Sequence, residues 1–305
     1  MNILSAGQFN KQLINKILDS AKKMETALKR GNVPQKLRGK IIACLFFEPS
    51  TRTRLSFETA ALRLGGQVLG MENGLISSSA FKGESISDTI KIIHSFADLI
   101  VIRHPRDGSA EAAAKVSNVP IINAGDGGNQ HPTQSLLDLY TIQKETGRLE
   151  NLAVAMVGDL LYGRTIHSTL TMLSLYPKNK FIFVSPTQLK LPEKYKVLLK
   201  KRKVSFMETK NLAEGLKQAD VIYMTRVQKE RFASKTEYEK LKLAYVFGAK
   251  ELKQIKKTAV ILHALPRVGE ITESVDKDPR AVYFRQAQNG LYVRMALLQY
   301  ALGIK

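Results

Sequence analysis

The sequence lacks the features that mark several common protein classes. It contains one cysteine, Cys44, so an internal disulfide cannot form and a reducing cytoplasm suits the chain. Its five histidines are scattered, without the paired spacing of a metal site. No apolar run approaches the roughly 20 residues needed to cross a bilayer, and the first residues do not resemble a secretory signal. We therefore expect a cytoplasmic protein with no membrane partner and no metal.

The net charge of +20 is large. Such a charge is typical of nucleic-acid binding, of acidic small substrates or of a lysine-rich solvated surface. Basic segments such as 194–206 and 250–259 read as surface helices, and they lack the dense basic and aromatic interleaving of a single-strand binder. Because no known nucleic-acid motif is visible either, we expect no nucleic-acid partner.

Short apolar runs alternate with helix-period segments, and we interpret the runs as strands. Continuous apolar strands separated by helices indicate parallel sheets covered on both faces. Seven runs are one too few for a closed eight-strand barrel, so the predicted class is α/β with open, doubly wound parallel sheets. A domain boundary is expected within 144–154, where a helix ends at Gly147 and a strand begins near Leu152. The runs are 40–47, 98–105, 119–125, 152–159, 180–186, 220–226 and 259–266.

Arginine or histidine follows nearly every predicted strand. Ligands of open α/β sheets bind outside the carboxyl ends of the strands. Cations concentrated there predict an anionic substrate. The motifs that follow the strands are EPSTRTR, RHP, NAGDGGNQHPTQ, GDLLYGRT, TRVQKER and HALPRVGEI.

The stretch LFFEPSTRTRLSFETA predicts an anion site at a helix start. Pro49 disfavours helix at the residue before it, and Ser50 is a good N-cap. Residues 51–53 then lie in the first turn, where backbone N–H groups lack partners and phosphate binds readily. Arg52 and Arg54 are about 200° apart on the helix, so one can hold a ligand while the other braces the fold.

These motifs, in this order, resemble the aspartate/ornithine carbamoyltransferase family, and within it the members that act on aspartate. The resemblance covers residues 45 to 271 and the helices that flank them. It implies transfer of the carbamoyl group from carbamoyl phosphate to L-aspartate, an early step of pyrimidine synthesis, with no cofactor or metal. It also implies a carbamoyl-phosphate domain of 1–146 plus 285–305, whose last helix packs back on that domain, and an aspartate domain of 147–284.

The resemblance assigns most of the carbamoyl-phosphate site. Phosphate is held by Ser50, Thr51, Arg52 and Thr53. The carbonyl oxygen is surrounded by Thr53, Arg103 and His131, where fixed donors stabilise developing negative charge. Gln134 orients the carbamoyl NH2.

A polar loop, SSSAFKGES, resembles a segment that family members insert into a neighbouring subunit. The matching residues are Ser78 and Lys82, which touch carbamoyl phosphate, and Lys82 also reaches aspartate. The small polar residues and Gly83 predict a flexible loop. The resemblance therefore implies a homotrimer with shared sites, and a separate regulatory chain is possible. Phe81 departs from the basic residue that many members carry.

The second half carries residues that match the aspartate site: Arg164, Arg226 and Gln228. Two guanidinium groups suit two carboxylates, because each can bind bidentately. The backbone at Leu265 and Pro266 matches a segment that contacts carbamoyl phosphate and is cis in the family. Three further departures are Leu161, Ala264 and Gly269, and they weaken any expectation of allosteric control.

Three alternatives stay open at this stage, one of them a nucleic-acid-binding protein driven by the charge of +20, which salt-sensitive DNA affinity would support. Ornithine carbamoyltransferase shares the phosphate half but typically carries HCLP where this chain has HALP, and Arg226 with Lys229 suits an anionic acceptor. A P-loop nucleotide enzyme is suggested by GDLLYGRT, but the lysine that reaches the phosphates is replaced by Arg164.

Overall fold

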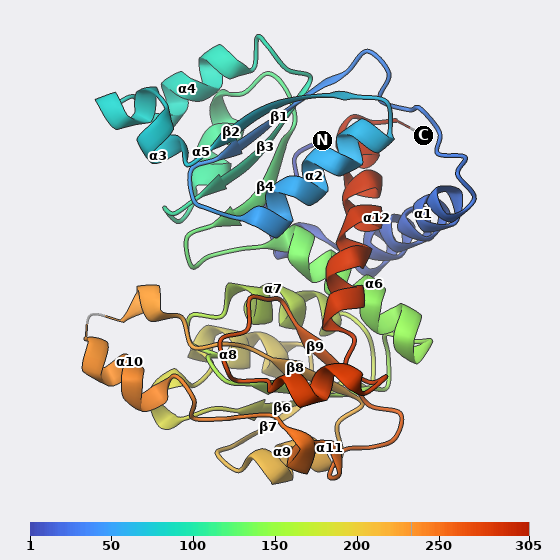
Figure 1. The fold of residues 1–305 in the computed structure, drawn as a ribbon, viewed down its shortest axis with the longest axis vertical. Coiled ribbons are helices and arrows are strands. Elements are labelled where there is room, and N and C mark those ends of the chain that lie inside the picture. Colours follow the sequence, from blue (N-terminus) through green and yellow to red (C-terminus); the bar gives the residue numbers. More distant parts are fainter. Residues whose placement is uncertain (233, 305) are drawn as a thin grey trace. The chain divides into compact units, whose positions relative to one another are not determined.

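The computed structural model describes residues 1–232 and 234–304 (Figure 1). The chain divides into two compact units, Met1–Tyr140 with Gln288–Lys305, and Thr141–Ala287. Each unit contains one all-parallel sheet. The predicted α/β class with two parallel sheets is therefore confirmed.

The first unit is built on a four-stranded sheet of order β2-β1-β3-β4. The strands are β1 (Ile41–Phe46), β2 (Gln67–Glu72), β3 (Leu99–His104) and β4 (Ile121–Asp126). Nearly all apolar side chains of β1, β3 and β4 are buried because helices cover both faces, whereas those of the edge strand β2 are not. The helices are α1 (Lys11–Lys29), α2 (Thr51–Arg63), α3 (Gly74–Ser77), α4 (Ile86–Ile93), α5 (Ser109–Val116) and α6 (Pro132–Thr146), with 3-10 turns η1 (Ala6–Gln8) and η2 (Ser79–Lys82).

The last helix, α12 (Tyr283–Ala301), returns to this first unit (Figure 1). The Gln299 amide nitrogen lies 3.2 Å from the Met24 sulfur of α1. The Arg294 guanidinium lies 5.1 Å from the centre of the Phe57 ring of α2. The prediction that the C-terminal helix packs back on the first domain is thus confirmed.

The second unit is built on a five-stranded sheet of order β7-β6-β5-β8-β9. The strands are β5 (Ala153–Val157), β6 (Lys180–Val184), β7 (Ser205–Thr209), β8 (Val221–Met224) and β9 (Val260–His263). The other elements are α7 (Arg164–Leu173), η3 (Thr187–Leu189), α8 (Glu193–Lys201), α9 (Leu212–Lys217), η4 (Lys229–Arg231), α10 (Lys235–Leu241), α11 (Ala249–Leu252) and η5 (Glu273–Lys277).

Two of the strands, β2 and β7, were not among the seven predicted ones. Both lie at a sheet edge. Both expose most of their residues, so neither has the continuous apolar run by which the others are recognised. The seven predicted runs correspond to β1, β3, β4, β5, β6, β8 and β9.

Two expectations from composition can be compared with the structure. In the part of the chain that the structure describes, no helix is long and apolar enough to cross a membrane. Cys44 is buried in β1, and burial raises the pKa of its thiol, so the side chain is an unreactive core residue.

Candidate active site

Each sheet has a point where the order of its strands reverses. In the first unit this point lies between β1 and β3, and in the second unit between β5 and β8. Crevices form outside the carboxyl ends of strands at such points, and ligands bind there. About half of the predicted site residues follow these four strands, and Arg103 lies on β3 itself.

Helix α2 follows β1 and begins at Thr51. Ser50 occupies the N-cap position, as predicted, but its hydroxyl makes no capping hydrogen bond. Its backbone, at φ −161° and ψ 86°, departs from the usual cap conformation. Ser50 therefore gives the first turn no side-chain cap, and the positive end of the helix can bind an anion. Thr53 is buried here, whereas Thr51 and Arg52 are exposed.

The two arginines of this helix behave differently, as their spacing predicts. The Arg54 guanidinium lies 2.9 Å from a carboxylate oxygen of Glu72 on β2 and 3.9 Å from one of Glu58. Arg54 therefore braces α2 against the edge strand. Arg52 lies on another side of the helix and is exposed.

Arg103 lies near the end of β3 and is fixed by a residue that the sequence reasoning did not assign. Its guanidinium donates to the Glu48 carboxylate at 2.7 Å and to the Ala124 carbonyl at 3.4 Å. Its Nε is buried and has no partner among the described residues. Glu48 stands within the same quoted motif as Ser50, but only the pairing of β1 with β3 brings it to Arg103.

His131 and Gln134 lie at the start of α6, where Pro132 takes the first helical position as predicted. Both side chains are buried. His131 Nδ1 lies 3.5 Å from the Thr133 hydroxyl. Gln134 donates its amide N–H to the Asp138 carboxylate at 2.8 Å.

The loop expected to be flexible, residues 77–85, follows the short helix α3 and contains the 3-10 turn η2, which Ser78 and Gly83 bound. Ser78 precedes η2 and accepts a hydrogen bond from the Ala80 N–H at 3.2 Å. Gly83 ends η2 at φ 93°. Lys82 is exposed, and Phe81 leaves 73% of its surface exposed. The turn η2 presents Lys82 and Phe81 outward from the first unit.

In the second unit, Asp159 joins the loops that follow β5 and β8. Its carboxylate accepts the N–H of Tyr162 at 2.9 Å and that of Gln228 at 3.2 Å. The Gln228 amide nitrogen returns a 2.7 Å hydrogen bond to the Tyr162 carbonyl. Burial raises the pKa of Asp159, and these N–H groups and the Arg226 charge oppose that rise. The loops of Arg164 and Arg226 are thereby locked together.

The segment after β9 is held by a buried histidine. The Leu265–Pro266 bond is cis, as the resemblance implies. His263 Nδ1 accepts the Leu265 N–H at 2.8 Å, and its Nε2 donates to Glu270 at 2.7 Å. Glu270 also accepts the Val268 N–H at 2.9 Å. These bonds fix the backbone at Leu265.

Comparison with known proteins places this geometry in a family. The carbamoyl-P binding domain of aspartate/ornithine carbamoyltransferase matches residues 1–144, and the Asp/Orn binding domain of the same family matches 150–301. The aspartate carbamoyltransferase catalytic subunit of Clostridium perfringens is 53% identical over 87% of this chain and 86% of its own length. That of Clostridium novyi is 50% identical over 96% and 92%.

The chain belongs to the aspartate/ornithine carbamoyltransferase family.

Solved structures of aspartate transcarbamoylases agree. The catalytic subunit from M. jannaschii superposes with a TM-score of 0.92 at 49% identity, covering 99% of this chain and 98% of that one. The enzyme from Trypanosoma cruzi, in complex with carbamoyl phosphate and aspartate, superposes with a TM-score of 0.93 at 38% identity, covering 97% and 95%. The expectation of a carbamoyltransferase of the aspartate type is confirmed.

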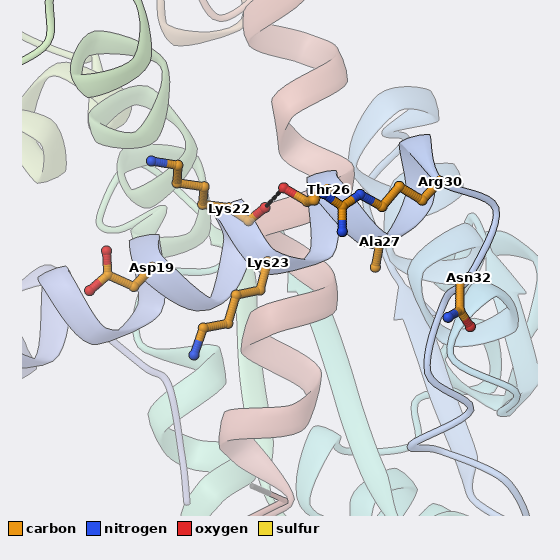
Figure 2. Close-up of a pocket in the computed structure, with 7 residues that line it drawn as sticks. All are labelled: Asp19, Lys22, Lys23, Thr26, Ala27, Arg30 and Asn32. Atoms are coloured by element: carbon orange, nitrogen blue, oxygen red, sulfur yellow. Dashed lines mark hydrogen bonds between the residues drawn. The ribbon is translucent and has the colours of Figure 1, made fainter.

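Within residues 1–232 and 234–304, no group of three or more His, Cys, Asp or Glu side chains is arranged to bind a metal ion. A shallow hollow of about 580 Å³ lies along α1 (Figure 2). Figure 2 shows Lys22 and Lys23 projecting to opposite sides of that helix. The two lysines of the hollow therefore do not converge on one point, and none of the predicted site residues lines the hollow. The residues are Asp19, Lys22, Lys23, Thr26, Ala27, Arg30 and Asn32.

Proposed function

We propose that this chain transfers the carbamoyl group of carbamoyl phosphate to the amine of L-aspartate, giving N-carbamoyl-L-aspartate and phosphate for pyrimidine synthesis. The observation that carries the proposal is the start of α2, where Ser50 makes no capping hydrogen bond; it follows β1, which pairs with the strand that carries Arg103 at the reversal point of the first sheet. An anion-binding helix end and a fixed guanidinium on the neighbouring strand suit an acyl phosphate.

The phosphate group binds Ser50, Thr51, Arg52 and Thr53 in this proposal. The backbone N–H groups of the first turn and the Arg52 charge supply donors to its oxygens. Ser78 and Lys82 complete the phosphate site, as the family resemblance implies. Arg54 takes no part, because Glu72 and Glu58 already hold it.

The carbonyl oxygen faces Thr53, Arg103 and His131. As the aspartate amine attacks the carbonyl carbon, a C–N bond forms and negative charge develops on this oxygen. The bond from carbon to the phosphate oxygen then breaks, and the departing phosphate takes a proton from the amine. Donors already fixed in place, such as Arg103 on Glu48, stabilise the charge without reorganising.

The carbamoyl NH2 donates to Gln134 and to the backbone at Leu265 and Pro266. Aspartate binds Arg164, Arg226 and Gln228, with Lys82 as a further contact. The two arginines match its two carboxylates. The Asp159 hydrogen bonds support this assignment, because they hold both arginine loops in one arrangement.

We further propose a cytoplasmic homotrimer in which Ser78 and Lys82 act in the site of a neighbouring subunit. The outward position of Lys82 on η2 supports this arrangement. Mixing inactive Lys82→Ala with inactive Arg52→Ala chains should restore activity, since some shared sites then contain both intact residues. Verified mixed oligomers without activity would contradict it. A regulatory chain would be detected as a copurifying subunit that changes the dependence of the rate on aspartate concentration.

The proposed aspartate site is tested by the substitution Arg226→Gln. Loss of a charge-assisted contact of about 1.5–3 kcal/mol predicts a 10- to 100-fold lower kcat/KM for aspartate, with little change in carbamoyl-phosphate affinity. Arg148→Gln is the matched control, because Arg148 lies on the same unit and pairs with Asp220 at 3.8 Å instead. Equal kinetics in the two variants would contradict the assignment of Arg226.

A further inference from the structure

The orientation of the Gln134 amide is fixed by its neighbour on α6. Gln134 Nε2 donates to Asp138 Oδ1 at 2.8 Å, one helical turn away. Gln134 leaves 8% of its surface exposed and Asp138 none. An ionised carboxylate only accepts hydrogen bonds, so the amide nitrogen has to face it. A reversed amide would place two oxygens together in a buried setting. The Gln134 carbonyl oxygen is therefore the end that points away from Asp138.

A buried cation on α12 supports the charge of Asp138. Arg294 leaves 3% of its surface exposed. Burial lowers the pKa of Arg294 to about 10, and the Asp138 charge opposes that fall. Gly290 makes room for the guanidinium, since a Cβ there would lie 2.2 Å from Arg294 Nη1. Arg294 also stacks on Phe57 of the phosphate-binding helix. Asp138 is thus tied to α2, α6 and α12.

We propose that Asp138 is a positioning residue that makes Gln134 a hydrogen-bond acceptor, and that this selects an acyl phosphate bearing an NH2 group over one bearing a methyl group. The inference rests on the proposed function, in which Gln134 meets the carbamoyl NH2. A buried acceptor left without its donor is costly, so a site built this way rejects an analogue that lacks the N–H. Acetyl phosphate, with CH3 in place of NH2, is that analogue.

The test is Asp138→Asn, assayed with carbamoyl phosphate and with acetyl phosphate. Asparagine keeps the size of the side chain but can itself donate, so it no longer dictates which end of the Gln134 amide faces it. We expect kcat/KM for carbamoyl phosphate to fall about 10- to 100-fold and that for acetyl phosphate to change less than about threefold. Asp19→Asn, at an exposed site on α1, is the control. Equal losses with both substrates would overturn the inference.

A double-mutant cycle separates positioning from general support. If Asp138 acts through Gln134, Asp138→Asn should have no further effect on the preference between the substrates in a Gln134→Ala background. Additive effects would overturn the inference while leaving the proposed function intact. An unmutated chain that forms no carbamoyl-aspartate would instead overturn the proposed function, so the two failures are distinguishable.

Asp138→Asn leaves Arg294 without its counter-charge, and the variant can lose its fold for that reason. The double variant Asp138→Asn, Arg294→Met removes the buried cation as well. It should show the same loss of preference for carbamoyl phosphate. A folded double variant that keeps the full preference would overturn the inference.

Discussion

Arg103 donates a 2.7 Å hydrogen bond to Glu48, and this joins the ends of two neighbouring strands, β1 and β3. The Arg103 side chain is 11% exposed and the Glu48 side chain 31%. Because Glu48 already holds the Arg103 guanidinium in the absence of a ligand, the remaining N–H donors of Arg103 keep a fixed orientation. The ion pair is therefore a device for orienting the guanidinium, beyond any contribution to stability.

Replacing Glu48 should accordingly reduce catalysis more than stability. Glu48→Gln keeps an acceptor but loses the charge, so Arg103 is held more loosely. We expect kcat/KM to fall by about tenfold, with a change in unfolding free energy of no more than about 1 kcal/mol. Glu72→Gln is the matched control, because Glu72 pairs with Arg54 in the same unit. Similar kinetic losses in both variants would remove the orienting role of Glu48.

The two arginines of α2 should separate function from stability. Arg52→Ala should abolish turnover while the thermal midpoint stays within a degree or two, because an exposed side chain contributes little to stability. Arg54→Ala should do the reverse, lowering stability by up to about 1 kcal/mol and leaving turnover largely intact. Steady-state kinetics and thermal melts on both variants measure the contrast. Near-normal turnover in Arg52→Ala would contradict the phosphate assignment.

Gly158 controls the spacing of the two loops of the aspartate site. Its φ is +113°, and a Cβ there would lie 2.3 Å from the Thr225 carbonyl oxygen. Gly158→Ala should push the loops of Arg164 and Arg226 apart and raise KM for aspartate at least about tenfold. Gly39→Ala controls for backbone strain alone, because Gly39 has φ +76° and no atom within 4 Å of its Cβ position. Unchanged aspartate kinetics in Gly158→Ala would show that the loop spacing is unimportant.

His167 should make stability depend on pH. Burial lowers its pKa to about 4, below an unfolded value of about 6.5. Its ring stacks on Tyr195 at 4.3 Å, and Nε2 donates to the Leu160 carbonyl. The folded state therefore holds His167 neutral. Its contribution is complete above about pH 6.5 and is lost as the pH falls toward 4, amounting to about 2 kcal/mol between pH 7 and pH 5.

The comparison for His167 is with His167→Gln, which keeps a donor but does not titrate. Thermal midpoints measured from pH 7 to pH 5 should fall less steeply in this variant than in the unmutated chain. Identical slopes for His167→Gln and the unmutated chain would mean that another group is responsible.

The sequence predicted the interior of the fold better than its edges. Strands such as β1 and β5 are covered on both faces and appear as continuous apolar runs. The edge strand β2 is mostly exposed, so hydrophobicity does not reveal it. The loop at Ser78 contains the turn η2, which is bounded by a cap at Ser78 and by Gly83 in the left-handed region, details that composition does not specify.

The predicted ligand-contacting residues follow recognisable motifs, but the residues that hold them do not. Glu48, Asp138 and Asp159 act on partners brought to them by strand pairing, helix geometry or loop contacts. A carboxylate beside an apolar run looks like an ordinary surface residue until its partner is known. Ser50 shows a further limit of sequence reasoning: the residue occupies the N-cap position as predicted, but its hydroxyl makes no capping hydrogen bond.

The most direct test of the account is product formation from carbamoyl phosphate with L-aspartate and, in parallel, with L-ornithine as the acceptor. The two arginines of the second unit suit an acceptor with two carboxylates. The account predicts carbamoyl-aspartate from the first reaction and no citrulline from the second. Citrulline with ornithine, or no product with either acceptor from a folded protein, would contradict it.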